Sequence, residues 1–320
     1  MRTIDWVDDA VELIDQTRLP DELLVLRVTE VDALVAAIRS LAVRGAPALG
    51  VAGAFGVALA IRQFAGDPAG LADAVRRIET ARPTAVNLAR GARRAAARLA
   101  DGPAAVLAEA CAVRDEEIAA SAAMATLGAD LLVELCGARP RLLTHCNSGA
   151  LAAVTGGTAL GVVGELHRRG ALTSVIASET RPLLQGARLT AWELEQWGVD
   201  FRVAVDSAGP FLMARGEVDA VILGADRICA NGDVINKIGT YAHALGAQRA
   251  GLPFVVVAPE TTVDADTPDG AAVEIEDRGA AEVTGFSAAV NPAFDVTPHD
   301  LVTAIVTDRR VIRLDRGEKP

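Results

Sequence analysis

The pattern of apolar residues changes once along the chain, just before Pro140, and this change constrains the fold more than any other feature. From Val31 to Cys136, Ala-rich stretches with helical periodicity follow one another, separated by Gly and Pro. After Pro140, short apolar runs that suit buried strands alternate with helical stretches. Such alternation is typical of repeated βαβ units and predicts a mainly parallel sheet. We therefore expect an α/β protein with two domains, residues 1–137 and 138–320.

The expected elements differ between the two domains. Residues 1–30 alternate apolar and polar positions around Pro20, which predicts two short antiparallel strands and a turn. The helices expected in the rest of the first domain are Asp32–Leu41, Pro47–Phe64, Leu71–Thr80, Val86–Leu99 and Ala104–Leu135. The strands expected in the second domain are Leu142–His145, Ser174–Ala177, Phe201–Val205, Ala220–Leu223 and Pro253–Val257, with a helix from Ile238 to Arg249. The acidic, turn-rich stretch Asp264–Gly285 fits a surface loop or an edge hairpin.

The charge balance excludes several kinds of partner. The chain has 31 Lys and Arg against 42 Asp and Glu, which gives a net charge of −11. A general nucleic-acid binder needs a basic face to neutralise phosphates, and so does a protein held on an anionic membrane. The longest uncharged run, Gly45–Ile61, is shorter than the ~20 apolar residues of a transmembrane helix. We expect no nucleic acid and no membrane as partner, while an anionic small substrate in a locally basic pocket stays open.

The cysteines and the N-terminus indicate a soluble cytoplasmic protein. Cysteines at positions 111, 136, 146 and 229 are too few and too scattered for a disulfide framework. The sequence contains no CxxC pair or Cys/His cluster that would indicate zinc, and the N-terminus lacks the apolar core of a signal peptide. It also contains neither GxGxxG nor GxxxxGK[ST], which argues against a dinucleotide or P-loop site. We therefore expect neither a metal nor a cofactor.

Two predicted strands end in residues that can carry chemistry. In open α/β sheets, ligands bind beyond the carboxyl ends of the strands. Cys146 follows the strand Leu142–His145, and Asp226 follows the strand Ala220–Leu223 after two small residues. A thiol and a carboxylate in one pocket can donate and accept protons, and a helix expected directly after Cys146 would favour its thiolate. On the residues alone, a buried small apolar side chain is the alternative for Cys146.

Cations at three places could bind a phosphate. Arg44-Gly45-Ala46-Pro47 opens the long apolar helix, where backbone N–H groups beside an arginine form a phosphate cradle. Arg82 precedes the expected helix Val86–Leu99 and offers a second cation. The chain has two lysines, and Lys319 lies in the terminal tail, so Lys237 is the lysine of the folded body. A lysine at a predicted helix start, in a chain that otherwise uses arginine, suggests a role for its compact ammonium in binding, and a solvated lysine is the alternative. For Arg44–Pro47 the alternative is an ordinary N-cap turn with a surface arginine.

Taken together, these and further motifs resemble the methylthioribose-1-phosphate isomerase family. Its relatives are ribose-1,5-bisphosphate isomerases and the regulatory subunits of the eukaryotic initiation-factor guanine-exchange complex. The motifs come in the family's order and span residue 43 to nearly the C-terminus. They are Val43–Gly50, Arg82–Leu88, Leu143–Leu151, Glu179–Pro182, Gln185–Leu194, Gly224–Ile228, Asn231–Asp233, Asn236–Tyr241 and Asn291–Pro298.

The resemblance implies a metal-free aldose–ketose isomerase that converts 5-methylthioribose 1-phosphate into 5-methylthioribulose 1-phosphate in methionine salvage. The family's catalytic pair falls on Cys146 and Asp226. Its substrate-binding positions fall on Arg44, Gly45, Ala46, Arg82, Gln185, Asn236 and Lys237. It also implies an N-terminal, mostly helical domain with a small antiparallel sheet, then a Rossmann-like domain with a mainly parallel sheet, usually as a homodimer.

The chain departs from the family's pattern at positions that bear on the 5-substituent of the sugar. Ala89 and Arg90 stand where aromatic residues are common, and Ser148 replaces the usual Thr. Three alternatives therefore stay open: 5-deoxyribose 1-phosphate as substrate, ribose 1,5-bisphosphate as substrate, or a non-catalytic subunit that senses a sugar phosphate or a nucleotide. The retention of both Cys146 and Asp226 argues against the non-catalytic subunit.

Overall fold

The computed structural model describes residues 2–83 and 85–320, and the chain forms two compact units. Unit one comprises the residues up to Ala119 together with Ala150–Gly157, and unit two comprises Ala120–Gly149 and Thr158–Pro320. The division falls inside the long helix α5 (Pro103–Cys136), whereas the sequence predicts a boundary at its end. Residues 150–157 also belong to unit one although the segments before and after them belong to unit two, so no single boundary along the chain separates the two units.

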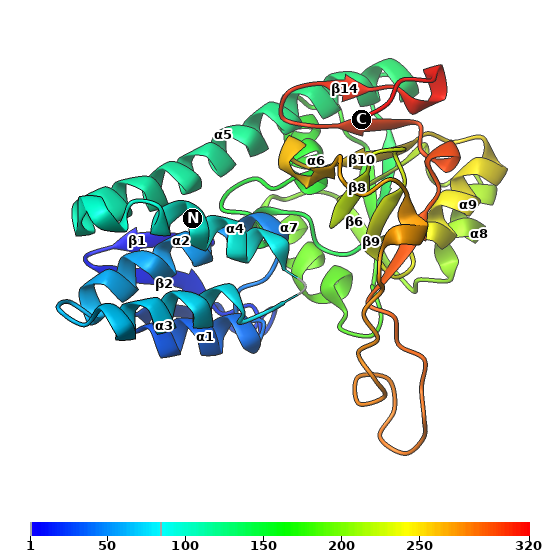
Figure 1. Cartoon of the computed structure of the whole chain (residues 1–320). Helices are drawn as coiled ribbons and strands as arrows, with labels where there is room; N and C mark the ends of the chain where they lie inside the picture. The colour runs from blue at the N-terminus through cyan, green and yellow to red at the C-terminus, as the bar shows by residue number, and fades with distance from the viewer. Residues whose placement is uncertain (1, 84) are drawn as a thin grey trace. The chain divides into compact units, whose positions relative to one another are not determined.

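Unit one combines a small sheet with helices, as predicted. Strands β1 (Ile4–Val7), β2 (Ala10–Ile14) and β3 (Val25–Val28) form an antiparallel sheet in that order, one strand more than expected. Helices α1 (Val31–Arg39), α2 (Ala46–Gln63), α3 (Pro68–Glu79) and α4 (Val86–Ala96) precede α5 and confirm the predicted helices (Figure 1). Short helical turns elsewhere in the chain are Leu99–Asp101, Ala150–Ala152, Gly186–Thr190, Glu260–Thr262, Gly270–Ala272, His299–Leu301 and Leu314–Arg316.

Helix α2 forms the centre of unit one because its residues are apolar on every side. All residues from Pro47 to Ile61 are buried. The helix packs against α4 so closely that a Cβ on Gly91 would lie 1.9 Å from the Gly50 carbonyl oxygen. Glycine at position 91 therefore permits backbone-to-backbone contact between the two helices, and a larger residue would separate them.

Within residues 2–83 and 85–320, two helices are long and apolar enough to cross a membrane by length and composition, α2 with a mean hydropathy of 1.3 and α5 with 1.5. Packing within the protein accounts for the apolar character of α2. The apolar window of α2 is 78% buried and that of α5 is 33% buried. Within unit two, Leu132 of α5 is in the core, and Asp130 and Glu134 pair with Arg169 and Arg313. A core helix passes the same test, so these two helices are weak evidence for a membrane protein.

Unit two is built on a seven-stranded sheet in the order β14-β13-β10-β7-β4-β5-β6. Every neighbouring pair is parallel except β13 and β14, which are antiparallel. The strands are β4 (Arg141–Thr144), β5 (Ser174–Ser178), β6 (Phe201–Ala204), β7 (Ala220–Leu223), β10 (Phe254–Val257), β13 (Ala304–Val306) and β14 (Val311–Ile312). The five predicted strands are all present, each within one residue of its expected ends, and the predicted α/β class is confirmed.

Both faces of this sheet are covered, which explains the continuous apolar runs of its strands. Leu142 and Ala220 belong to a core with helix α6 (Ala159–Arg168) and the end of α5. Leu143 and Val221, one residue further along the same strands, belong to a core on the other face. Helices α8 (Ala208–Ala214) and α9 (Thr240–Ala250) lie side by side there, and α7 (Ala191–Gln196) precedes β6 (Figure 1).

The strand order identifies the position of the site. Numbered along the chain, the six parallel strands lie in the order 3-2-1-4-5-6, the doubly wound arrangement of a Rossmann-like domain. The order reverses between β4 and β7, which are neighbours with Leu142 opposite Ala220. Ligands of such sheets bind in the crevice beyond the carboxyl ends of the strands at this switch point.

A second sheet in unit two was not predicted. Its order is β11-β8-β9-β12, from β11 (Val263–Asp264), β8 (Arg227–Cys229), β9 (Val234–Lys237) and β12 (Phe294–Thr297). Lys237, predicted at the start of a helix, therefore ends a strand, and α9 begins three residues later at Thr240. The stretch Asp264–Gly285, predicted as a loop or an edge hairpin, contributes the second residue of β11, and residues 273–293 then extend from unit two as a long loop, orange in Figure 1.

Candidate active site

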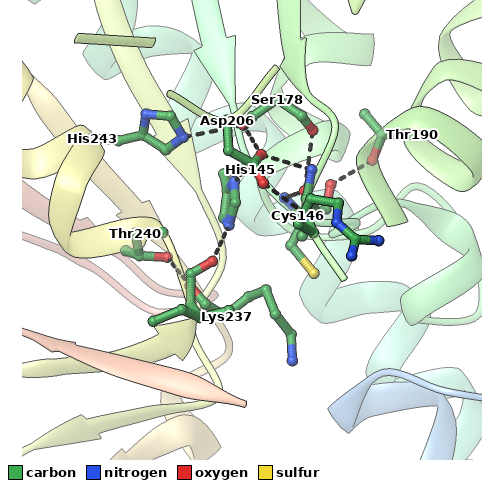
Figure 2. Close-up of polar contacts among 12 residues, drawn as sticks. His145, Cys146, Ser178, Thr190, Asp206, Lys237, Thr240 and His243 are labelled. Carbon is green, nitrogen blue, oxygen red and sulfur yellow. Dashed lines mark hydrogen bonds and ion pairs between the residues drawn. The ribbon is translucent and has the colours of Figure 1, made fainter. Parts of the chain in front are cut away.

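Cys146 lies in the loop directly after β4, at the switch point of the sheet. Its backbone is in the left-handed region, with φ of 61°, which costs a non-glycine residue about 1–2 kcal/mol. Two buried threonines stabilise this conformation. The Cys146 N–H donates to Thr180 Oγ1 at 2.9 Å. The Cys146 carbonyl accepts from Thr190 Oγ1 at 2.6 Å, as Figure 2 shows. The backbone on both sides of the thiol is thus held, while the residue keeps 9% of its surface exposed.

The predicted effect of a helix dipole on Cys146 is wrong. After Cys146 the chain forms the short turn Ala150–Ala152, and helix α6 begins at Ala159. The dipole of a helix acts within its first turn, so α6 starts too far along the chain for the predicted arrangement.

Asp206 anchors the neighbouring loop from the end of β6. Its carboxylate accepts the Ser178 hydroxyl, the Thr180 N–H at 2.7 Å and the Arg181 N–H at 2.7 Å. Burial raises the pKa of Asp206, but the hydrogen bonds from Ser178, Arg181 and Thr180 outweigh this and hold the pKa below its usual value. At neutral pH an ionised carboxylate therefore organises the loop whose Thr180 binds Cys146.

Two buried histidines lie behind this loop. His145 Nε2 is 2.8 Å from the Ile238 carbonyl oxygen, and the His145 and His243 rings meet edge to face with centroids 5.0 Å apart. His243 Nε2 is 3.3 Å from Ser178 Oγ (Figure 2). Burial lowers the pKa of His145. Burial also lowers the pKa of His243, and the charge that His145 would carry adds to this effect, so that the pKa of His243 is about 3. Both are neutral at neutral pH, and His243 is a buried residue of helix α9.

Asp226 leaves the sheet at the same edge as Cys146. Strands β4 and β7 are parallel neighbours with Leu143 opposite Val221, so the loops after both strands begin side by side. Asp226 is exposed, and its N–H donates to the Ile235 carbonyl at 2.9 Å, which ties this loop to β9. The structure thus brings the two predicted catalytic positions to neighbouring strand ends.

Asn236 and Lys237 end strand β9, next to these loops. The buried Asn236 donates from Nδ2 to Thr240 Oγ1 at 2.9 Å. Lys237 Nζ donates to the Ala293 carbonyl at 2.8 Å and lies 4.6 Å from the centroid of the Phe294 ring. Figure 2 shows the Cys146 thiol and the Lys237 amine pointing away from the buried hydrogen-bond network. Lys237 is therefore an oriented cation rather than a solvated one.

Asp295 caps helix α9 beside Lys237. Its carboxylate accepts the Gly239 N–H at 2.7 Å and the Tyr241 N–H at 3.2 Å. Burial raises the pKa of Asp295 to about 6, although the two backbone hydrogen bonds and the charge of Lys237 act in the opposite direction. This carboxyl group therefore titrates close to neutral pH.

Gln185 carries a buried acceptor without a partner. The residue is 6% exposed, directly before the turn Gly186–Thr190, and its Oε1 has no hydrogen-bond donor in the described part of the chain. A buried acceptor left unsatisfied costs about 1–3 kcal/mol, so a bound hydroxyl group would relieve this cost. The same turn supplies Thr190 to Cys146.

A buried carboxylate also supports the loop that follows Cys146. Glu193 is 2% exposed, and Asn147 Nδ2 donates to its Oε2 at 2.6 Å. A Cβ on Gly149 would lie 2.2 Å from the same oxygen. Position 149 therefore requires glycine, and the loop is packed against Glu193 with no room for a side chain.

The remaining predicted binding residues belong to unit one. Gly45, with φ of 95°, precedes α2, and a Cβ there would lie 2.2 Å from the Ala152 carbonyl oxygen. Arg44 and Ala46 flank it, and Pro47 stands in the first turn of the helix as predicted. Arg82 is half-buried and precedes α4.

Two further residues of this region bear on the predictions. Thr84, within the motif that begins at Arg82, lies outside the described residues. Arg90 is exposed on α4. The pKa of Glu116 is lowered chiefly by a hydrogen bond from Arg94, which outweighs the effect of burial, and the charge of Arg90 lowers it further. Arg90 thus lies close to an acidic residue of α5.

The sequence predicted no role for Thr180, Thr190 or Asp206. Thr180 and Thr190 stood in motifs of the family resemblance, but nothing local in the sequence shows which group they bind. Asp206 was detectable, because it follows β6 just as Cys146 follows β4 and Asp226 follows β7. In the described parts of the chain, residues 2–83 and 85–320, no group of three or more His, Cys, Asp or Glu side chains could hold a metal ion.

Comparison with known proteins gives matches along most of the chain. The model of the Initiation factor 2 subunit family matches residues 42–313. A methylthioribose-1-phosphate isomerase of Anaeromyxobacter sp. (strain Fw109-5) is 52% identical over 95% of this chain and 92% of its own length. A probable bifunctional methylthioribose-1-phosphate isomerase/methylthioribulose-1-phosphate dehydratase of Nocardia farcinica is 51% identical, and the chain spans 60% of its length.

Two solved structures are similar over the whole fold. A 5-methylthioribose 1-phosphate isomerase from Pyrococcus horikoshii OT3 matches with a TM-score of 0.91 and 38% identity, over 98% of this chain and 92% of that one. The translation initiation factor eIF-2B, subunit delta, from A. fulgidus matches with a TM-score of 0.88 and 42% identity, over 98% and 96%.

Proposed function

Because the chain belongs to the Initiation factor 2 subunit family, we propose that it is an aldose–ketose isomerase that converts 5-methylthioribose 1-phosphate into 5-methylthioribulose 1-phosphate. Its relatives named for this activity are about half identical to it over nearly its full length. The observation that carries the proposal is that Cys146 and Asp226 follow the two parallel strands at the switch point of the sheet.

The chemistry requires groups that move protons. In an aldose 1-phosphate the phosphate blocks the anomeric oxygen, so the ring does not open without help. An acid must protonate the ring oxygen as its bond to C1 breaks, hydrogen must pass from C2 to C1, and the C2 hydroxyl must lose its proton to become the ketone. We assign the proton transfers at the ring oxygen and the C2 hydroxyl to Asp226, with Cys146 as the second acid or base.

The binding residues fit a phosphorylated sugar. Arg44 and the backbone around Gly45 and Ala46 suit phosphate, because cations and N–H groups at a helix start attract anions. Lys237 suits an anionic group of the substrate through its oriented ammonium. Arg82 is assigned as a further cation. The unpaired Gln185 carbonyl and the buried Asn236 amide suit hydroxyl groups of the sugar.

Turnover on a panel of sugar phosphates tests the proposal. The purified chain is given 5-methylthioribose, 5-deoxyribose and ribose as 1-phosphates, the last also carrying a 5-phosphate, and ketose formation is followed by phosphorus NMR. We expect turnover with the methylthio sugar. C146S and D226N should lose most of it, whereas the control variants C111S and D266N should keep it. Near-parental turnover in folded C146S and D226N would contradict the assignment.

A non-catalytic regulatory subunit is the second candidate. It is favoured by the A. fulgidus structure, which is 42% identical over nearly the whole chain and is named as an initiation-factor subunit. This candidate predicts binding of a sugar phosphate or a nucleotide without turnover of any sugar in the panel. Preferred turnover of ribose 1,5-bisphosphate would instead identify the other isomerase of this family.

We further propose a cytoplasmic homodimer that works in methionine salvage without metal or cofactor. The acidic net charge of −11 suits a protein that remains free of anionic membranes and nucleic acid. Sedimentation equilibrium at several concentrations tests the dimer. Unchanged turnover after dialysis against EDTA tests the independence from metal.

A further inference from the structure

The backbone of Cys146 is held by two hydroxyl groups with opposite hydrogen-bond roles. Thr180 Oγ1 accepts the Cys146 N–H at 2.9 Å, and Thr190 Oγ1 donates to the Cys146 carbonyl at 2.6 Å. Both threonines are fully buried. They come from segments 34 and 44 residues further along the chain, so the tertiary structure brings them to this loop.

The orientation of the Thr180 hydroxyl is determined by its other partner. It has a single proton, which it donates to the Ser178 carbonyl at 3.0 Å. A lone pair is therefore left for the Cys146 N–H. The backbone of Thr180 is itself left-handed, with φ of 67°, and Asp206 binds its N–H at 2.7 Å. Asp206 thus supports Cys146 through Thr180.

Thr190 is oriented in the complementary sense. Its proton goes to the Cys146 carbonyl, and its oxygen accepts Asn147 Nδ2 at 3.3 Å. The same amide donates to the buried Glu193 at 2.6 Å. Each threonine is therefore supported by a carboxylate, Asp206 on one side of Cys146 and Glu193 on the other.

We propose that Thr180 and Thr190 are positioning residues that hold Cys146 in its left-handed conformation and so aim its thiol at the substrate. This inference rests on the proposed function for the identity of the reaction, but not for the geometry of the thiol. If the hydrogen bond from the Cys146 N–H to Thr180 Oγ1 is lost, the backbone of Cys146 can relax to a negative φ, and its side chain then moves. A displacement of about 1 Å can cost a reaction about 100-fold in rate.

Substitution of the Thr180 hydroxyl tests the proposal. T180V keeps the β-branched shape and removes the acceptor, whereas T180S keeps the hydroxyl. We expect T180V to lower kcat by about 10–100-fold with KM changed little, and T180S to restore most of kcat. T297V is the matched control, because Thr297 is buried in β12 and its hydroxyl has no hydrogen-bond partner in the described part of unit two.

A second readout does not depend on turnover. The rate of Cys146 alkylation by iodoacetamide is measured by mass spectrometry of the peptide that contains it. We expect this rate to differ at least about fivefold from the parental rate in T180V and to return to the parental rate in T180S. The rate depends on the exposure and the surroundings of the thiol, and both change if Cys146 moves. T190V is the second variant, which tests the other side of Cys146 if T180V does not fold.

The outcomes separate the two proposals. If the parental chain turns over no sugar phosphate, the proposed function fails, while the alkylation rates still decide whether Thr180 positions the thiol. Parental kcat and parental alkylation in T180V would overturn the positioning role. Equal losses in T180S and T180V would also overturn it, because the hydroxyl would then not be the cause.

Discussion

Replacement of Asp295 by asparagine should remove a pH-dependent cost to stability. Asp295 is half-buried at the start of α9, where its carboxylate accepts the Gly239 and Tyr241 N–H groups. Burial raises its pKa from the ordinary value of 3.8 to about 6, against the two hydrogen bonds and the charge of Lys237. Asparagine keeps an acceptor oxygen for the helix start and cannot ionise, so D295N isolates the effect of the charge.

The sign and the size follow from proton linkage. Between pH 3.8 and about 6 the folded chain binds more protons at Asp295 than the unfolded chain, so the free energy of unfolding falls as pH rises through this window. The whole shift corresponds to about 3 kcal/mol. Between about pH 4.5 and about pH 7.5 the loss is about 2 kcal/mol, because part of it has already occurred at the lower pH.

Urea unfolding followed by circular dichroism measures this loss. The parental chain and D295N are unfolded at both pH values, and their difference in unfolding free energy is compared. We expect D295N to gain about 2 kcal/mol relative to the parental chain between the lower and the higher pH. D266N, at an exposed aspartate, is the control and should show no such gain. A difference between parent and D295N that stays constant within about 0.5 kcal/mol would refute the argument that burial raises this pKa.

Two further predictions concern packing, and urea unfolding measures both. G149A should destabilise unit two by about 1–3 kcal/mol and abolish turnover, because its Cβ would meet the Glu193 carboxylate at 2.2 Å, whereas G285A, with open space around it, should leave both unchanged. F55A should cost about 3–5 kcal/mol, since Phe55 is fully buried in unit one, and F286A, at a side chain 94% exposed, should cost less than about 0.5 kcal/mol. A small effect of F55A, or a large one of F286A, would contradict the described core.

The elements that the sequence predicted well are those with a strong local signal. The five strands of the parallel sheet are buried on both faces, so each appears as a continuous apolar run, and Ala220–Leu223 was predicted to the residue. The second sheet of unit two was missed because its strands are short and mixed in burial. Val263–Asp264 has two residues, and Arg227–Cys229 starts at a charged position. Such strands form because they pair with a neighbouring strand, and a local pattern of residues does not predict this pairing.

The candidate site divides in the same way. The rule that ligands bind beyond the carboxyl ends of parallel strands pointed to Cys146 and Asp226, and the structure places them after neighbouring strands. The rule applied to β6 would have found Asp206. Lys237 stands out in the sequence as a rare residue, but the sequence predicts a helix start there, because the turn and strand before it have no apolar run long enough to predict β9.

By itself, the sequence determined the class of the fold, the strands of the parallel sheet and the two strand ends that carry a thiol and a carboxylate. These features depend on apolar runs and their periodicity, which are local properties of the sequence. The tertiary structure decided how those groups are held. Cys146 depends on Thr180 and Thr190, and Thr180 depends on Asp206, through hydrogen bonds that join residues 26 to 44 positions apart. A hydroxyl group has the same local signature whether it faces water or a backbone amide, so the partner that gives it a role becomes visible when the chain is folded.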